Sequence, residues 1–182
     1  MAKNPAAIKP DFPFLRSHPA HLIALGFGAG LSPWMPGTAG TLLGWALFAL
    51  LNPWLTPTEW AALLVGGFVL GQRACAQTGI DLNAPDHGAM VWDELIAFWF
   101  VLVALQLQGP LPLPVPPAQQ MLAMQALAFV VFRAFDIIKP PPIRQFEARF
   151  KTPGANAGFG VMADDMLAAG YTLLVLAAVK WL

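Results

Sequence analysis

The stretch that decides the fold is Met90-Val91-Trp92-Asp93-Glu94-Leu95-Ile96-Ala97-Phe98-Trp99-Phe100-Val101-Leu102-Val103-Ala104-Leu105. Two adjacent carboxylates stand near its head, and no charged residue follows until Arg133. A charge at the centre of a bilayer-spanning helix costs about 2.5–3.5 kcal/mol, so ionisable residues gather at helix ends or in polar cavities. The stretch therefore predicts an apolar helix whose first turns, with Asp93 and Glu94, meet water.

The composition favours a membrane protein. Hydrophobic residues make up 57% and charged residues 11% of the 182 residues, whereas soluble domains are about 25% charged. Basic and acidic residues number 10 each, which excludes a strongly basic nucleic-acid binder. The single cysteine excludes an intrachain disulfide framework and a multi-thiolate zinc site. We predict one domain over residues 1–182, with a polar N-terminal arm over residues 1–18.

The apolar pattern predicts an all-α fold, a polytopic membrane helical bundle with a re-entrant N-terminal segment. The re-entrant segment is expected from His21 to Thr38, because this apolar, glycine-rich run ends in a proline-rich break and irregular backbone at membrane depth must lie inside protein or along a wet cavity. Helices are expected over residues 41–51, 60–71, 90–107, 118–138 and 164–181. These runs are short against the roughly 20 residues of a spanning helix, so a water-soluble helical bundle stays open as an alternative.

The basic residues predict an orientation. Lys and Arg precede the first apolar segment and follow the second and fourth helices, whereas the turns at residues 52–59 and 109–117 contain none. By the positive-inside rule the basic group faces the cytoplasm and the two turns face out. This multi-pass topology brings five carboxylates to one depth on the cytoplasmic side: Asp93, Glu94, Asp136, Asp164 and Asp165.

Helix capping is the simplest alternative explanation for these acids. Asp and Glu cap free N–H groups and favour the positive end of the helix dipole, which explains Asp93-Glu94 or Asp164-Asp165 equally well when each pair is taken alone. Capping fails for Asp136, which is expected at a helix C-terminus, where the dipole disfavours a negative charge. An intrahelical pair with Arg133 or Lys139, three residues away on either side, would be worth only about 0.2–0.5 kcal/mol.

Crowded carboxylates indicate a metal. Two like charges about 4 Å apart repel by roughly 4 kcal/mol at an effective dielectric of 20, and a divalent cation removes that repulsion. Oxygen ligands of this kind suit Mg²⁺ or Mn²⁺, and Mg²⁺ usually shares its shell with substrate phosphate. Arg133, Lys139 and Arg144 are close in sequence and can neutralise phosphate oxygens. Phosphoryl chemistry at the cytoplasmic membrane face is therefore the leading hypothesis.

Two further groups have competing explanations. His87, just before the central helix, can donate a proton to a leaving alkoxide, but an ordinary loop histidine explains it too. Residues 36–41, which include Thr38, can offer backbone N–H groups to an anion at the head of a helix, or can form a plain turn with Thr41 as the N-cap.

Two other classes of function compete with an enzyme. A membrane cation carrier or channel also places carboxylates among helices, but at mid-membrane depth along a path. A non-catalytic helical interaction protein would have acidic clusters that are only helix caps.

Four ordered blocks of the sequence resemble the phosphatidylglycerophosphatase A family. The blocks are Gly-Leu-Ser-Pro-Trp-Met-Pro-Gly-Thr-Ala-Gly-Thr (30–41), Asp-His-Gly-Ala-Met-Val-Trp-Asp-Glu (86–94), Phe-Arg-Ala-Phe-Asp-Ile-Ile-Lys-Pro-Pro-Pro-Ile-Arg (132–144) and Gly-Phe-Gly-Val-Met-Ala-Asp-Asp (158–165). The resemblance implies a Mg²⁺-dependent lipid phosphatase of the bacterial inner membrane. It would convert phosphatidylglycerophosphate to phosphatidylglycerol in phospholipid biosynthesis, with its active site facing the cytoplasm. Nothing in the sequence predicts the oligomeric state.

The resemblance also assigns roles by position. The family's acidic motif positions, which would hold the metal and act in catalysis, fall on Asp93, Glu94, Asp136, Asp164 and Asp165. Lys139 lies in the third block and is expected to act with them. The residues expected to bind the phospholipid substrate are Thr38, His87, Arg133 and Arg144.

Overall fold

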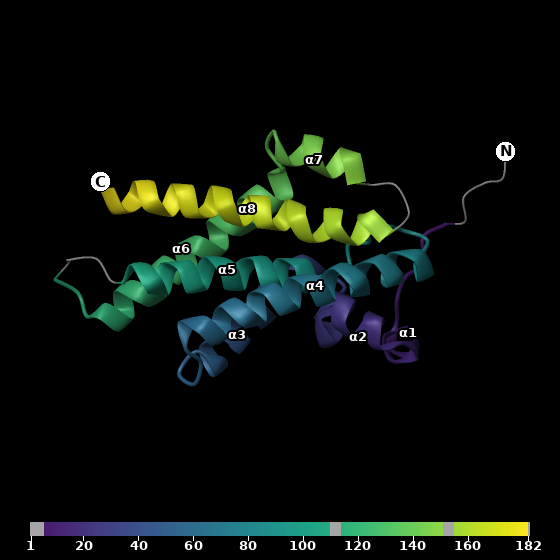
Figure 1. Ribbon diagram of the computed structural model, residues 1–182, viewed down its shortest axis with the longest axis horizontal. Coiled ribbons are helices and arrows are strands. Elements are labelled where there is room, and N and C mark those ends of the chain that lie inside the picture. The colour runs from purple at the N-terminus through teal and green to yellow at the C-terminus, as the bar shows by residue number, and fades with distance from the viewer. Residues whose placement is uncertain (1–5, 110–113, 151–154, 182) are drawn as a thin grey trace.

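The computed structural model describes residues 6–109, 114–150 and 155–181, and within these ranges every regular element is a helix (Figure 1). The elements are α1 (Phe12–Ser17), α2 (Pro19–Ala24), the 3₁₀ helix η1 (Gly26–Leu31), α3 (Pro36–Leu51), α4 (Pro57–Asp81), α5 (Trp92–Gln108), α6 (Pro117–Ile138), α7 (Ile143–Phe150) and α8 (Ala155–Trp181). The predicted all-α class is therefore confirmed.

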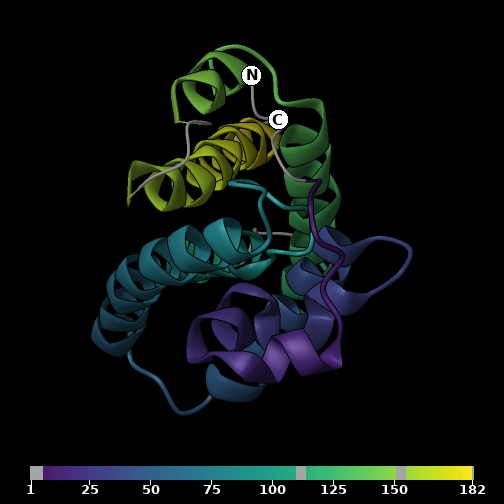
Figure 2. The ribbon, with the colours of Figure 1, turned by 90° about the vertical axis from the view of Figure 1, so that its right-hand side faces the viewer.

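Helix α5 is the centre of the bundle. It packs against α3, α4, α6 and α8, and every residue from Trp92 to Trp99 is buried. A helix that is apolar on all sides needs partners on all sides, which explains why the quoted stretch organises the chain. Figure 2 shows α7 lying over α8 on one side of the bundle, with α1 and α2 on the opposite side.

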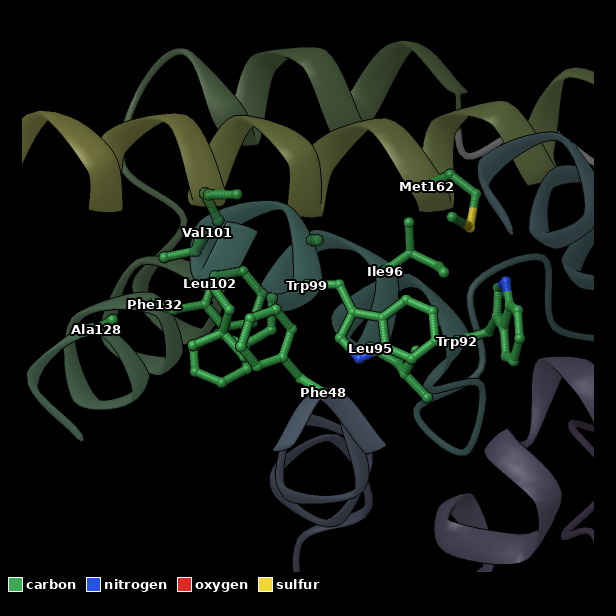
Figure 3. Close-up of a cluster of buried hydrophobic side chains, with 14 of the residues drawn as sticks. Phe48, Trp92, Leu95, Ile96, Trp99, Val101, Leu102, Ala128, Phe132 and Met162 are labelled. Carbon is green, nitrogen blue, oxygen red and sulfur yellow. The ribbon is translucent and has the colours of Figure 1, made fainter. Parts of the chain in front are cut away.

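Aromatic side chains fill the core around α5 (Figure 3). Trp99 meets Trp60 of α4 edge-on, with ring centroids 5.3 Å apart, and Phe98 meets Phe132 of α6 at 5.6 Å. Both buried indole N–H groups of α5 have acceptors: Trp99 donates to the Gly44 carbonyl at 2.7 Å, and Trp92 donates to the Gly67 carbonyl at 2.9 Å. These contacts fix how α5 is rotated, and hence the direction in which its carboxylates point.

The re-entrant segment has more regular structure than the sequence indicated. Residues 19–31 form α2 and η1, and α3 begins at Pro36 rather than at Thr41. Proline is favoured at the first position of a helix because its missing N–H is not needed there. The N-cap reading of Thr41 is wrong: its hydroxyl lies inside α3 and donates to the Gly37 carbonyl at 2.9 Å.

Helix α4 is longer than predicted, since it continues to Asp81 instead of ending near residue 71. Its added turns are polar on one side but bury Ala74, Cys75 and Thr78. At the end of α4, the Asp81 carboxylate lies 2.8 Å from Nε2 of the buried His21. This contact links α2 to α4. Hydropathy dropped at residue 72 because the helix becomes amphipathic there, not because it ends.

Helix α8 begins at Ala155, so the prediction that Asp164 and Asp165 stand at a helix N-terminus was wrong. The preceding residues are small, and glycine disfavours helices in isolation. Here Gly158 packs so tightly on α4 that a Cβ on it would overlap the Gln72 carbonyl oxygen. Close backbone packing thus overrides propensity, and the two aspartates lie within the body of α8.

Two helices are long and apolar enough to cross a membrane, judged by length and composition: Pro117–Ile138 in α6 and Asn156–Val179 in α8. Most of the α6 segment is not buried by the rest of the chain, and Leu122, Val130 and Ile137 are each at least 60% exposed. Large apolar surfaces of this kind on a folded protein mark contact with a membrane or another protein.

The packing of α8 on α4 gives a matched pair of substitutions within one helix. We expect Gly158→Ala to lower the free energy of unfolding by about 1–3 kcal/mol, as overpacking does. Gly170→Ala has nothing within 4 Å of the new Cβ and is expected to be neutral or to stabilise by up to about 1 kcal/mol through helix propensity. Unfolding in detergent measures both, and equal effects would contradict the close approach at Gly158.

Candidate functional site

Two carboxylates enter the site from the first turn of α5. Asp93 and Glu94 are only 7% and 9% exposed, and the helix has no side-chain N-cap. The Asp93 Oδ1 and Glu94 Oε2 atoms are buried without a hydrogen-bond partner. A capping carboxylate would be satisfied by the amides it caps, so capping leaves these two oxygens unexplained.

A third carboxylate joins them from α8. Asp165 is 3% exposed, and its Oδ2 atom is likewise buried without a partner. Asp93, Glu94 and Asp165 can each offer one oxygen such that all three lie within 4.8 Å of one another. Buried carboxylates cost several kcal/mol each unless they are paired, protonated or bound to a metal. Three converging carboxylates, each with a buried oxygen that lacks a partner, fit Mg²⁺ or Mn²⁺, which prefer oxygen ligands.

Helix α6 brings a fourth carboxylate together with its counter-charge. Arg133 Nη1 lies 2.6 Å from Asp136 Oδ2 and 3.5 Å from Glu94 Oε1, but neither contact has hydrogen-bond geometry. Asp136 is also within hydrogen-bonding reach of Asp165. It therefore lies beside the group of three, and Arg133 stands between carboxylates of two helices. The i,i+3 pair with Arg133 that competed with a metal role for Asp136 is present.

Lys139 pairs with the remaining carboxylate of the predicted set. Its Nζ lies 2.6 Å from Asp164 Oδ2. Burial on its own would lower the pKa of Lys139, but the Asp164 carboxylate more than offsets this and the pKa is raised. The lysine therefore stays cationic at any physiological pH. Asp164 faces this lysine rather than the group of three.

Lys139 also holds an unusual backbone position. It ends α6 in the left-handed conformation, with φ 44° and ψ 66°, where glycine or asparagine is the common choice. A lysine accepts this conformation at some cost. The ion pair between its side chain and Asp164 is a favourable contact that offsets this conformational cost.

The N-terminus of α3 closes another side of the site. A Cβ on Gly37 would overlap Glu94 Oε1 and lie 2.9 Å from both Nη atoms of Arg133. Only glycine lets the first turn of α3 come this near to the pair. Thr38 is the next residue, and Met35 before the helix provides no side-chain cap for the first amides of α3.

The structure does not bring all the predicted substrate-binding residues equally near. His87 Nδ1 accepts from the Ala89 amide at 3.1 Å, and burial lowers its pKa, as the loop-histidine alternative expects. Arg144 is exposed on α7, and no described contact joins it to the carboxylates. Asp86, which sequence reasoning left aside, lies near enough to contribute to the raised pKa of Lys139. Its position in the sequence block 86–94 could have indicated that Asp86 lies near the site.

Comparison with known proteins identifies the family. A model of the family described as phosphatidylglycerophosphatase A matches residues 22–180. The chain belongs to the phosphatidylglycerophosphatase A family. It is 38% identical over 164 residues to the phosphatidylglycerophosphatase A of Haemophilus influenzae, covering 90% of each chain. It is 39% identical over 155 residues to that of Escherichia coli, covering 84% of this chain and 78% of the relative.

A third relative is named for a different phospholipid. A protein of Bacteroides thetaiotaomicron provisionally named a phosphatidylinositol-3-phosphatase is 34% identical over 163 residues, covering 88% of this chain and 92% of the relative. No solved structure matches the chain. The phosphatidylglycerophosphatase A family is one of phosphoric monoester hydrolases, which confirms the predicted class of enzyme. The roles of the individual residues stay predictions.

The tight approach of α3 predicts a separation of activity from stability. The atoms that a Cβ at Gly37 would meet are the ends of flexible side chains, so Gly37→Ala should leave the unfolding midpoint nearly unchanged while displacing Glu94 and Arg133. A displacement of about 1 Å at an active site can cost about 100-fold in rate. We therefore expect phosphate release to fall about 10- to 100-fold.

The control is Gly66→Ala on α4, where a Cβ meets nothing within 4 Å. This variant should keep wild-type activity. Full activity of Gly37→Ala would show that the Glu94–Arg133 contact is not needed for the reaction.

Proposed function

We propose that this chain hydrolyses the phosphate monoester of phosphatidylglycerophosphate, giving phosphatidylglycerol and inorganic phosphate. The observation that carries the proposal is the buried group of Asp93, Glu94 and Asp165, which can bring one carboxylate oxygen each within 4.8 Å of the others and which each have a buried oxygen without a partner. Family membership and the names of two relatives supply the substrate. This reaction would be a step of bacterial phospholipid biosynthesis.

The proposed cofactor is Mg²⁺. Asp93, Glu94 and Asp165 would hold it, with Asp136 and Asp164 as flanking carboxylates. When bound, the ion would polarise the phosphoryl group and lower the pKa of a bound water. The residues of the chain do the rest, by keeping these carboxylates away from bulk water and by orienting them toward one another.

The cationic groups around the carboxylates are proposed to hold the phosphate. Arg133 has Nε and Nη1 hydrogens without acceptors in hydrogen-bond geometry, and a guanidinium presents these donors in a fork that matches phosphate. Lys139 would add a second positive charge from the end of α6. The free amides at the head of α3, including that of Thr38, would face the same oxygens.

The nucleophile that attacks phosphorus is either water or one of the aspartates. In either case the bond between phosphorus and the ester oxygen breaks, and the glycerol oxygen of the lipid takes up a proton. A phosphoaspartate can be trapped with labelled phosphate on the protein, and direct attack by water leaves none. His87 is a weak candidate for the proton donor, because its lowered pKa keeps it neutral at pH 7.

We propose that the chain crosses the bacterial inner membrane several times and that its active site faces the cytoplasm. The ends of α3 and α5 and the start of α6 lie toward one end of the molecule, while α1, α2, the end of α4 and the start of α8 lie toward the other (Figure 1). The first end lacks basic residues in its turns, and the second contains most of them. This separation supports a bundle oriented by the positive-inside rule.

Asp136→Asn tests the role of α6. Because Asp136 contacts both Arg133 and Asp165 without belonging to the group of three, its loss should disturb their orientation and lower phosphate release about 10- to 100-fold, as is typical for residues that orient metal ligands. Asp11→Asn is the matched control, since Asp11 is exposed and caps α1, where asparagine serves equally well. Unchanged activity in Asp136→Asn would support an interaction protein or a plain surface pair.

Metal removal tests the site by two readouts, phosphate release and thermal stability, and the second does not depend on activity. After chelation the protein should release no phosphate, and added Mg²⁺ should restore release. Binding to the folded state alone stabilises it by about 2.7 kcal/mol at 100 times the dissociation constant, so Mg²⁺ should also raise the unfolding midpoint. Asp93→Asn should lose most of this rise, whereas Asp11→Asn should keep it. Equal rises in both variants would place the ion elsewhere.

A further inference from the structure

A wholly apolar cavity opens beside the carboxylates. It has a volume of about 400 Å³, which is within the range of ligand pockets. It lies between α4, α5 and α8, and its lining residues are Ala61, Leu64, Val65, Phe68, Val69, Ile96, Phe100 and Met166. No polar side chain lines it, so the cavity suits hydrocarbon and not a headgroup.

The cavity and the carboxylate site share two helices, α5 and α8. Ile96 and Phe100 follow Asp93 by three and seven residues, so they share its side of α5. Met166 directly follows Asp165 in α8. In Figure 3 Ile96 and Trp92 of α5 lie beside Met162 of α8, one turn before Met166. The helices that hold the carboxylates therefore also form the walls of the cavity.

The axial order of these residues matches a phospholipid. At 1.5 Å per residue, Ile96 lies about 4.5 Å and Phe100 about 10 Å farther along α5 than Asp93. On α4, the lining from Ala61 to Val69 extends over about 12 Å. The cavity thus runs from the level of the carboxylates toward the end of the bundle whose connecting turns lack basic residues. A lipid whose phosphate lies at the carboxylates has its chains in that direction.

We propose that this cavity binds an acyl chain of the lipid phosphomonoester substrate. The inference rests on the proposed function, because an acyl chain reaches the cavity only if the phosphate of the lipid lies at the carboxylates. Burial of the chain would anchor the lipid beside the carboxylates and favour long-chain substrates. Other bilayer lipids without a monoester phosphate would lack the contact at the carboxylates and would compete poorly for the cavity.

Val65→Trp fills the cavity from a position that is already 66% exposed, so folding should tolerate it. Val130→Trp on α6 is the matched control, because Val130 is 64% exposed and does not line the cavity. With palmitoyl substrate in mixed micelles, Val65→Trp should raise KM about tenfold, equal to losing the burial of about two methylene groups. The kcat value should stay within about twofold, and KM for a hexanoyl substrate should change much less. Val69→Trp, also on the lining, should repeat this pattern.

A readout independent of turnover separates this inference from the proposed function. A phospholipid with a photoreactive group on its acyl chain should label α4 around Val65 and Val69, and unlabelled phosphatidylglycerophosphate should suppress that labelling but not labelling near Val130. Suppressed labelling without any phosphate release would overturn the proposed function and leave the cavity assignment standing. Labelling that is equal at Val65 and Val130 and not suppressed would show bulk lipid only. That result, or an unchanged KM in Val65→Trp, would overturn the assignment.

Discussion

The structure depends on holding like charges together away from water. Five carboxylates meet where α5, α6 and α8 come together, and four of them are at most 9% exposed. Neighbouring charges of one sign repel by roughly 4 kcal/mol at contact distance, and each also loses hydration. Nothing in an apolar bundle compensates such a cost unless cations are supplied at the same place. The last turns of α6 supply two, at Arg133 and Lys139.

The two cations divide the carboxylates into sets with different surroundings. Lys139 is engaged with Asp164, and Arg133 with Asp136 and, at longer range, Glu94. The three oxygens left without partners belong to Asp93, Glu94 and Asp165. Such a division makes chemical sense for a phosphomonoester hydrolase, because the reaction needs a site for a divalent cation and separate positive groups for the phosphate oxygens. We propose that Asp93, Glu94 and Asp165 serve the first need and that Arg133 and Lys139 serve the second.

Close backbone approaches make this geometry possible. Gly37 allows α3 to reach the Glu94–Arg133 pair, and Gly158 allows α8 to lie against α4. The aromatic contacts of α5 fix its rotation, so that Glu94 lies beside Arg133 of α6 and Asp93 lies near Asp165 of α8. An apolar cavity of about 400 Å³ then remains between α4 and the two carboxylate-bearing helices α5 and α8. Relatives named for different phospholipid headgroups are compatible with a phosphate site shared by the family, with differences in what surrounds it.

The sequence by itself determined the helical class, the central place of α5 and the bounds of α6, because an uninterrupted apolar run and a proline stop act locally. It also indicated that acids from three regions would meet, since the placement of basic residues restricts the topology. Helix ends at residues 72–81 and 155–163 were not predictable in this way. Residues 72–81 continue α4 with one buried and one polar side, and residues 155–163 form α8 where Gly158 packs against the backbone of α4, so neither helix end appears in the hydropathy. Which oxygens have partners was likewise decided by the tertiary structure, because pairing depends on distances between side chains of different helices and not on their spacing along the chain.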